Sequence, residues 1–174
     1  MNKIKAIIIC CCVICLFSCS SQSSQLDSIS GTVTKVISGQ TVEVILTNST
    51  QTSQVVKVRI IGIDAPDLRQ SPWGKAAKQR LSELVMNQPI KLTLQTLNTD
   101  RYQRLNAHLW VLDTLVSQQL VKEGCVLANT GYDHTYSKLL IDSQEYARLM
   151  GYGIWNPQNP MRYPPNQFRL NNKN

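Results

Sequence analysis

The sequence predicts an α+β fold that is mainly a β-barrel, and two observations carry this prediction. Five short segments are rich in β-branched or alternating apolar residues, which is typical of strands. A single helical pattern separates the third segment from the fourth. Five strands with one helix between the third and the fourth is the order of an OB-fold barrel. The predicted strands are 29–46, which a turn at 38–40 divides in two, 55–63, 90–97 and 105–112.

The third strand and the turn after it carry charged residues in a regular arrangement. Apolar residues alternate there with Lys57 and Arg59, which is typical of a strand with one buried face. The strand ends at 64–67, because Pro66 lacks a backbone donor and forces Ala65 into an extended conformation. We therefore expect the polar groups of this turn to lie at the edge of the barrel.

Three helices complete the predicted fold. The first begins at Ser71-Pro72, which is typical of an N-cap followed by a first-turn proline, and ends near Met86. The others span 115–122 and 135–150, and Gly151 closes the last one. The inner side of this last helix is expected to hold Tyr136, Leu139, Leu140, Tyr146 and Met150.

The two ends of the chain differ in composition from the predicted domain. Lys3 and Lys5 precede an apolar stretch, and the motif 16–19 resembles a bacterial lipobox, in which Cys19 receives the lipid. An ordinary cleaved signal peptide and an uncleaved anchor are the alternatives. We expect a lipoprotein held on the outer side of the cytoplasmic membrane or in the outer membrane. The predicted parts are a signal peptide at 1–19, a flexible tether at 20–28, the domain at 29–155, and a Pro/Asn-rich tail at 156–174 that is extended or disordered.

Charge and cysteine content narrow the classes of function. The net charge of +7 falls to +5 once a leader with Lys3 and Lys5 is removed, which favours a nucleic acid or an anionic membrane surface as partner. Cys125 is the single cysteine after residue 19, so the domain forms no internal disulfide, and we interpret this residue as a small buried hydrophobe. His108, on a strand, is expected to be solvent-facing or hydrogen-bonded, and His134 to lie in a loop. Neither is expected to bind a metal.

Three segments, 38–41, 59–67 and 99–104, combine the residue types that phosphodiester hydrolysis needs. Charge builds on the non-bridging oxygens during attack by water, and arginine meets two such oxygens with a fork that stays protonated. A hard cation requires oxygen ligands, and a further carboxylate can orient the attacking water. Taken alone, each segment can also be interpreted as having no catalytic role, with its polar residues lying on a strand or in a turn. The three together, in this order, are hard to attribute to coincidence.

These segments resemble the thermonuclease (staphylococcal-nuclease-like) family, and so do 72–77, 120–124 and 153–155. The resemblance covers 29–155 and implies an OB-fold monomer that hydrolyses DNA, and RNA as a second substrate, with calcium as cofactor. It gives Arg59 and Arg104 the role of stabilising the phosphate, and Asp67 the place of the catalytic glutamate. The remaining implied roles are calcium ligation by Asp64, the Ala65 carbonyl and Gln40, contacts to a neighbouring phosphate by Arg101 and Tyr102, and packing on a base by Tyr132.

Two of the implied site residues, Gln40 and Asp67, depart from the family pattern. Gln40 stands where the family has an aspartate, which removes a negative charge from the calcium site. Asp67 is one methylene shorter than glutamate, and a misplacement of about 1 Å can cost roughly 100-fold in rate. Reduced activity, an altered metal preference and an inactive homologue are therefore open outcomes. The alternative functions are a module that binds nucleic acid without cleaving it and an envelope protein that binds a protein partner.

Overall fold

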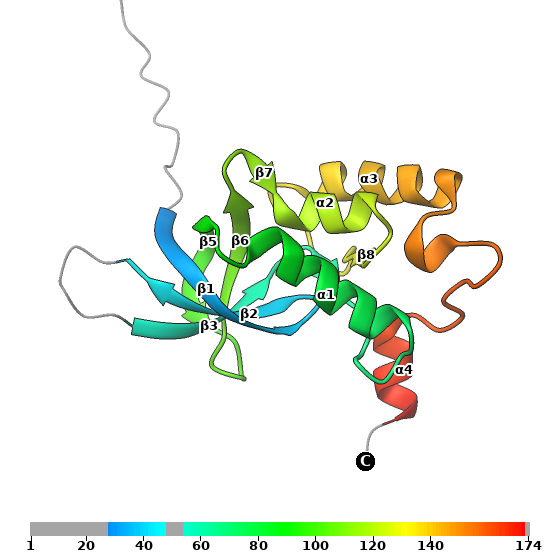
Figure 1. Ribbon diagram of the computed structural model, residues 1–174, viewed down its shortest axis with the longest axis horizontal. Coiled ribbons are helices and arrows are strands. Elements are labelled where there is room, and N and C mark those ends of the chain that lie inside the picture. Colours follow the sequence, from blue (N-terminus) through cyan, green and yellow to red (C-terminus); the bar gives the residue numbers. More distant parts are fainter. Residues whose placement is uncertain (1–27, 48–53, 173–174) are drawn as a thin grey trace, which may run out of the picture.

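The computed structural model describes residues 28–47 and 54–172, apart from the side chains of residues 96–98 (Figure 1). The predicted leader with Cys19 and most of the predicted tether lie outside these residues. The lipid anchor therefore stays a prediction. Within the two described ranges, none of the helices has the length and apolarity needed to cross a bilayer.

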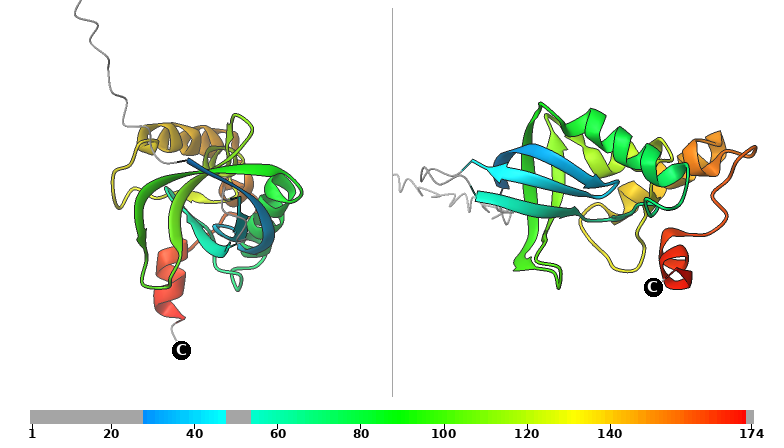
Figure 2. Two further views of the ribbon diagram at one scale, coloured as in Figure 1. Left: turned by 90° about the vertical axis from the view of Figure 1, so that its left-hand side faces the viewer. Right: turned by 60° about the horizontal axis from the view of Figure 1, so that its bottom comes forward.

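Five strands form a closed mixed barrel, as predicted. The strand order is β3-β2-β1-β5-β6, and neighbours in this order are antiparallel. The first and last strands then pair in parallel, which joins the two edges of the sheet. The left view of Figure 2 shows the strands curving around a common axis. The strands are β1 (Ser28–Ser38), β2 (Thr41–Leu46), β3 (Gln54–Ile60), β5 (Pro89–Thr99) and β6 (Leu105–Val111).

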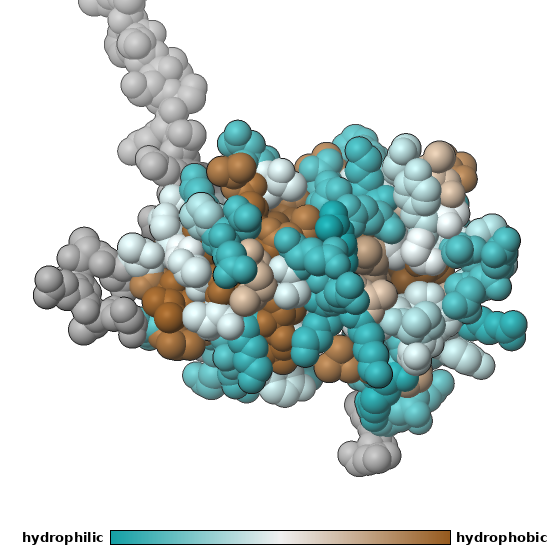
Figure 3. Space-filling model, in the orientation of Figure 1, coloured by the Kyte–Doolittle hydropathy of each residue, from teal (hydrophilic) through white to brown (hydrophobic). Residues whose placement is uncertain are grey.

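Helices cover the barrel and enlarge its core. The side chains of Ala77, Leu81 and Val85 on α1 (Trp73–Val85) pack into the apolar interior, while the outer face of this helix is polar. In Figure 3 hydrophilic side chains form a band over α1. Arg80 on this helix holds Glu123 through two hydrogen bonds of 2.7 and 2.8 Å. The remaining elements are α2 (Val116–Lys122), α3 (Ser137–Met150), η1 (Gly153–Trp155), α4 (Pro165–Asn171), and the short strands β4 (Ile63–Asp64), β7 (Thr114–Leu115) and β8 (Leu127–Ala128).

Two details of the predicted helices are wrong. Helix α1 begins at Trp73 with Pro72 in the N-cap position, and no side chain caps it, so Ser71 is not its N-cap. Helix α3 buries Leu140, Ser143 and Ala147. Two of these residues are small, α3 packs beside α2, and the Ser143 hydroxyl donates to the Leu139 carbonyl at 2.8 Å. Leu140 is buried and Tyr136 packs against the core, as predicted, but a hydropathy pattern favours large side chains and misses the two small buried residues. Leu139, Tyr146 and Met150, which were expected inside, are exposed.

The tail was predicted to be extended or disordered, but it contains a fourth helix, α4 (Pro165–Asn171). Pro165 occupies the first turn, where its fixed φ suits a helix and its missing N–H costs no hydrogen bond. Pro165 is the buried residue of this helix. Figure 1 shows α4 near the start of α1, apart from α2 and α3. A proline-rich segment thus supplies a helix start rather than an unstructured arm.

His108 is buried, contrary to the expectation that it faces solvent or is hydrogen-bonded. Its side chain is 2% exposed and its Nδ1 has no hydrogen-bond partner. The ring packs edge-on against Tyr136 at 4.6 Å and lies 5.2 Å from the ring of His134. Burial lowers the pKa of His108 to about 4. Cys125 is half-buried against the core, and burial raises the pKa of its thiol to about 11, which agrees with a packing role.

Candidate active site

Closure of the barrel brings two distant arginines together. Arg59 lies on β3, and in the parallel pairing of β3 with β6 it is opposite Asn106. Arg104 comes two residues before Asn106, just ahead of β6. Its Nη1 lies 3.5 Å from the Thr41 hydroxyl, and Thr41 is the β2 partner of Arg59. The two guanidinium groups are close enough that Arg104 acts to lower the pKa of Arg59.

Arg59 is held by the backbone of the turn that follows it. Its Nη1 donates to the Ile60 carbonyl at 2.8 Å and its Nη2 to the Ile63 carbonyl at 2.9 Å. Burial lowers the pKa of Arg59 to about 10, and the charge of nearby Asp64 opposes this shift. The guanidinium therefore remains protonated at neutral pH. Two of its five N–H groups are used by these bonds, which leaves three for a ligand.

Arg104 is fixed by Asp100. Asp100 Oδ2 accepts from Nε and Nη2 of Arg104 at 2.9 and 2.6 Å, and Oδ1 accepts from the backbone N–H of Tyr102 at 2.9 Å. Burial acts to raise the pKa of Asp100, but these hydrogen bonds outweigh it and the net pKa is lowered. Arg101 and Arg104 both place a guanidinium over the exposed Tyr102 ring, 4.9 and 5.0 Å from its centroid. The turn thus presents two cations and one aromatic face.

A cavity of about 310 Å³ opens beside these groups, which is room for a phosphate with its neighbouring sugar atoms. Tyr132 stands at this cavity and its hydroxyl accepts from the backbone N–H of Gly62 at 3.1 Å. Gly62 has φ of +80°, and a Cβ there would lie 2.6 Å from the His134 ring, so glycine is required at this turn. The cavity is lined by Arg59, Ile61, Gln95, Asp100, Asn106, Asn129 and Tyr132.

The predicted calcium ligands lie together, and each of them already has a partner. Gln40 Oε1 accepts from the Ala65 backbone N–H at 2.6 Å. Both Asp64 oxygens accept from Nη2 of Arg169, at 2.7 and 2.9 Å. Nη1 of the same arginine donates to the Ala65 carbonyl at 3.3 Å. A second cavity, of about 250 Å³, lies beside these groups and is lined by Ser38, Gln40, Ala65, Pro66, Asp67, Leu68 and Arg169.

The chemistry of these donors suits a hard cation, although weakly. Asp64, Ala65 and Gln40 contribute oxygen atoms, the ligand type that calcium prefers. A cation, the guanidinium of Arg169, is bound by the oxygens of Asp64 and Ala65. Over the described residues no cluster of three or more His, Cys, Asp or Glu side chains could hold a metal, so Asp64 is the single carboxylate of this set. The residues fit a divalent cation that keeps several water ligands.

Asp67 is bound by Arg69 and lines the second cavity. Its Oδ1 accepts from Nε of Arg69 at 2.9 Å and from the backbone N–H of Arg69 at 3.0 Å, and its Oδ2 lies 3.2 Å from Nη2. The hydrogen bond from Arg69 lowers the pKa of Asp67. Arg59, Asp64 and Arg104 thus converge, while Asp67 lies at the second cavity. Arg169 lies near both groups of residues, since its charge lowers the pKa of Arg59 and also that of Asp67.

Sequence reasoning missed Arg69 and Arg169. Arg69 follows the recognised turn by two residues, where its charge beside Asp67 was a usable signal. Arg169 lies 105 residues from Asp64, in a segment predicted to be extended. A lone basic residue in a polar tail gives no local sign of a contact at such a separation.

Comparison with known proteins agrees with this geometry. A family model described as "Staphylococcal nuclease homologue" matches residues 57–157, more than half of the chain. An uncharacterized endonuclease of Haemophilus influenzae is 33% identical over 141 residues, which are 81% of this chain and 73% of that protein. A thermonuclease of Staphylococcus intermedius is 29% identical over 129 residues, 71% of this chain and 74% of that protein. The protein belongs to the staphylococcal nuclease homologue family.

Proposed function

We propose that this protein is a calcium-dependent endonuclease that hydrolyses phosphodiester bonds in DNA, and in RNA as a second substrate. The observation that carries the proposal is the convergence of Arg104 and Asp64 on Arg59, which itself lines a cavity of phosphate size. Two guanidinium groups fixed before substrate arrives can stabilise charge on a phosphate without reorganising during the reaction. The names of the relatives, a thermonuclease and an endonuclease, support the same class of reaction.

In this proposal each residue has a defined task. The three free N–H groups of Arg59 and the outer N–H groups of Arg104 bind the non-bridging oxygens of the phosphate. Asp64, the Ala65 carbonyl and Gln40 would hold calcium, which would supply positive charge to neutralise and orient the phosphate. Arg101 and Tyr102 contact a neighbouring phosphate, and Tyr132 packs on a base. The net positive charge of the chain favours approach of a polyanion.

Asp67 orients the attacking water in this mechanism but is a weak base. Its pKa is lowered because Arg69 stabilises the ionised form, so it accepts a proton less readily than an unpaired carboxylate. Its Oδ2 accepts a single hydrogen bond and still has a lone pair for a water molecule. The expected enzyme is therefore slower than a relative with a glutamate at this position.

A cleavage assay tests the proposed function. The full-length chain, purified in detergent, is incubated with supercoiled plasmid and with single-stranded RNA in calcium, magnesium, manganese or chelator. We expect nicked and linear DNA in calcium and intact plasmid in chelator. Arg104→Ala, prepared in parallel, should lose this cleavage, which separates it from a contaminating nuclease. Intact plasmid in all metals would contradict an enzymatic role.

A module that binds nucleic acid without cleaving it is the second candidate, and one observation favours it. The two carboxylates at the working positions, Asp64 and Asp67, are each paired with an arginine. Such a module keeps the basic surface and needs neither calcium nor a positioned water. It would retard labelled single-stranded DNA in a gel with the same affinity in calcium and in chelator, and leave the DNA intact.

Replacing Gln40 by aspartate tests the proposed calcium site. Gln40→Asp restores a negative charge beside Asp64, so we expect calcium to bind roughly tenfold more tightly, in line with the tuning of such sites by ligand charge. Isothermal titration of both proteins with calcium measures the change. Gln40→Asn, which shortens the side chain without adding charge, is the matched control. Equal affinities for wild type and Gln40→Asp would place this residue outside the calcium site.

We also propose that Cys19 carries the lipid anchor and holds the domain at the outer face of a bacterial membrane. The lipobox-like motif 16–19 and the polar run 20–25 support this location. Mass spectrometry of the protein from a bacterial host is the direct measurement. A mature species that begins elsewhere, or that lacks acyl chains, would contradict the anchor.

A further inference from the structure

Helix α4 places a cation of the chain itself at the proposed cation site. Asp64 is the single carboxylate among the proposed ligands, and both of its oxygens accept from Nη2 of Arg169. The Ala65 carbonyl, a second proposed ligand, accepts from Nη1 of the same side chain. One guanidinium therefore occupies three of the oxygen atoms that a divalent cation needs. Arg169 also lies beyond residues 57–157, the range that the family model matches.

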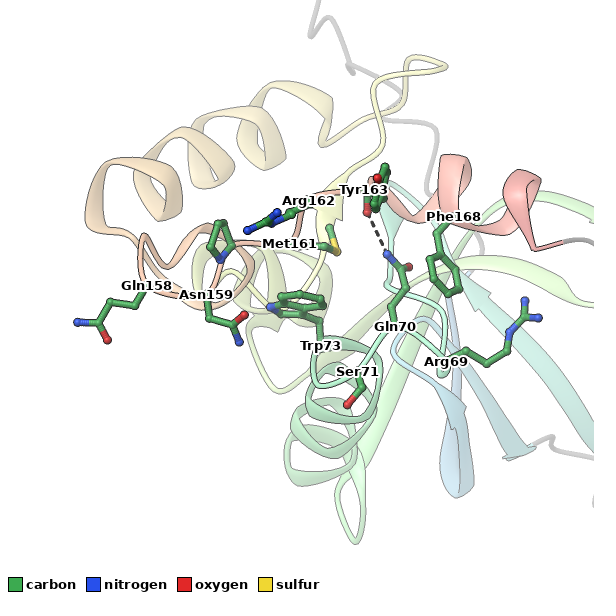
Figure 4. Close-up of a pocket in the computed structure, with 11 residues that line it drawn as sticks. Arg69, Gln70, Ser71, Trp73, Gln158, Asn159, Met161, Arg162, Tyr163 and Phe168 are labelled. Carbon is green, nitrogen blue, oxygen red and sulfur yellow. Dashed lines mark hydrogen bonds between the residues drawn. The ribbon is translucent and has the colours of Figure 1, made fainter.

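Few contacts attach α4 to the rest of the domain. Its buried residue is Pro165 at the first turn. Arg69 donates from Nη1 to the Asn172 carbonyl at 3.2 Å and lies 5.8 Å from the centroid of the Phe168 ring. Figure 4 shows Phe168 on α4 facing Arg69. The segment that precedes α4, residues 156–164, is called the arm here, and it crosses above the start of α1. A helix of this length gains little from its own hydrogen bonds, so its docking depends on these few contacts.

The arm before α4 has an attachment of its own. Gln70 donates from Nε2 to the Tyr163 carbonyl at 2.9 Å, the contact drawn as a dashed line in Figure 4. A cavity of about 380 Å³ lies beneath the arm at this point, between Trp73, Met161 and Phe168. The arm can therefore stay docked through Gln70 while α4 turns outward and withdraws Arg169.

We propose that α4 is an autoinhibitory latch, in which Arg169 competes with a divalent cation for Asp64 and Ala65. In the latched state the guanidinium neutralises Asp64 and blocks the cation. Release of α4 frees both carboxylate oxygens and the carbonyl. The inference rests on the cation site of the proposed function, and it adds that the chain itself limits access to that site.

The strength of the latch follows from the exposure of the ion pair. The side chains of Arg169 and Asp64 are 38% and 18% exposed, so water screens the pair in part. The hydrogen bonds of the pair are short, however, and a hydrogen bond between two charged groups is stronger than one between neutral groups. We expect the latched state to predominate about tenfold, which would weaken the apparent affinity for calcium by about the same factor.

Calcium binding to full-length variants in detergent tests the latch without relying on catalysis. Arg169→Gln removes the competing charge, and Arg162→Gln removes the same charge from an exposed position on the same arm. By isothermal titration, Arg169→Gln should bind calcium about tenfold more tightly than wild type, and Arg162→Gln should match wild type. In hydrogen exchange, calcium should speed the exchange of amides 166–171 in wild type.

The outcomes separate this inference from the proposed function. If no variant cleaves DNA but the affinities follow the expected order, the latch stands and the proposed function fails. Equal calcium affinity in wild type and Arg169→Gln, an equal gain in Arg162→Gln, or no calcium binding by Arg169→Gln overturns the latch. Cleavage by wild type in chelator that Arg169→Gln loses also overturns it, because Arg169 would then be a working cation of the site.

Discussion

Replacing Arg59 by lysine is expected to lower kcat for DNA cleavage by roughly 100- to 1,000-fold, the range found when one donor to a charged transition state is removed. Arg59 is half-buried, lines the cavity, and is held by two hydrogen bonds from its guanidinium to backbone carbonyls. Lysine keeps the charge but has no fork, so it can neither hold both carbonyls of the turn nor meet two phosphate oxygens. Because charge is retained, the loss measures geometry rather than net charge.

Two measurements accompany the kinetics of Arg59→Lys. Urea unfolding shows whether the released Ile60 and Ile63 carbonyls have cost the fold, for which we expect about 1 kcal/mol per lost hydrogen bond. Arg101→Lys is the matched control, since Arg101 is exposed and its stacking on Tyr102 concerns binding. Arg101→Lys should change KM more than kcat. A loss below tenfold in Arg59→Lys would show that this arginine does not meet the transition state.

The second large effect is a loss of stability in acid that depends on His108. Burial lowers the pKa of this residue from 6.5 to about 4 in the folded protein. A histidine with a depressed folded pKa contributes its full stability above the unfolded value, and the contribution is lost as the pH falls from 6.5 toward 4. Between pH 7 and pH 4.5 the free energy of unfolding should fall by about 2–3 kcal/mol on this account, at about 1.4 kcal/mol per pKa unit.

His108→Phe isolates this contribution from other titrating groups. Phenylalanine keeps an aromatic ring against Tyr136 and cannot be protonated, so the variant should lose about 2–3 kcal/mol less than wild type between pH 7 and pH 4.5. Urea unfolding of both proteins at each pH gives the difference, which is independent of any change in stability at neutral pH. Identical losses in the two proteins would mean that His108 is not buried in its neutral form.

Much of the fold followed from local sequence patterns. The turn at 38–40 separates β1 from β2, and Pro66 follows the end of the β3–β4 segment, because backbone preferences of glycine and proline act over a few residues. The face of α3 was predicted only in part: Leu140 is buried as expected, but Ser143 and Ala147, whose small side chains a hydropathy pattern ignores, are buried beside it. His108 lies on a strand, as predicted, but its side chain does not face solvent. The ring of His134 and that of Tyr136, just before α3, pack against it.

The sequence by itself determined which residues can act on a phosphate: two arginines, two aspartates and a turn that positions them. Only the tertiary structure decided how they are arranged. The parallel pairing of β3 with β6 sets Arg59 beside Arg104, and this register depends on closure of the whole barrel. Docking of α4 brings Arg169 to Asp64 across 105 residues. Periodicity and turn preferences describe neighbours along the chain. These two contacts join segments that are far apart in the sequence and come together only when the chain folds.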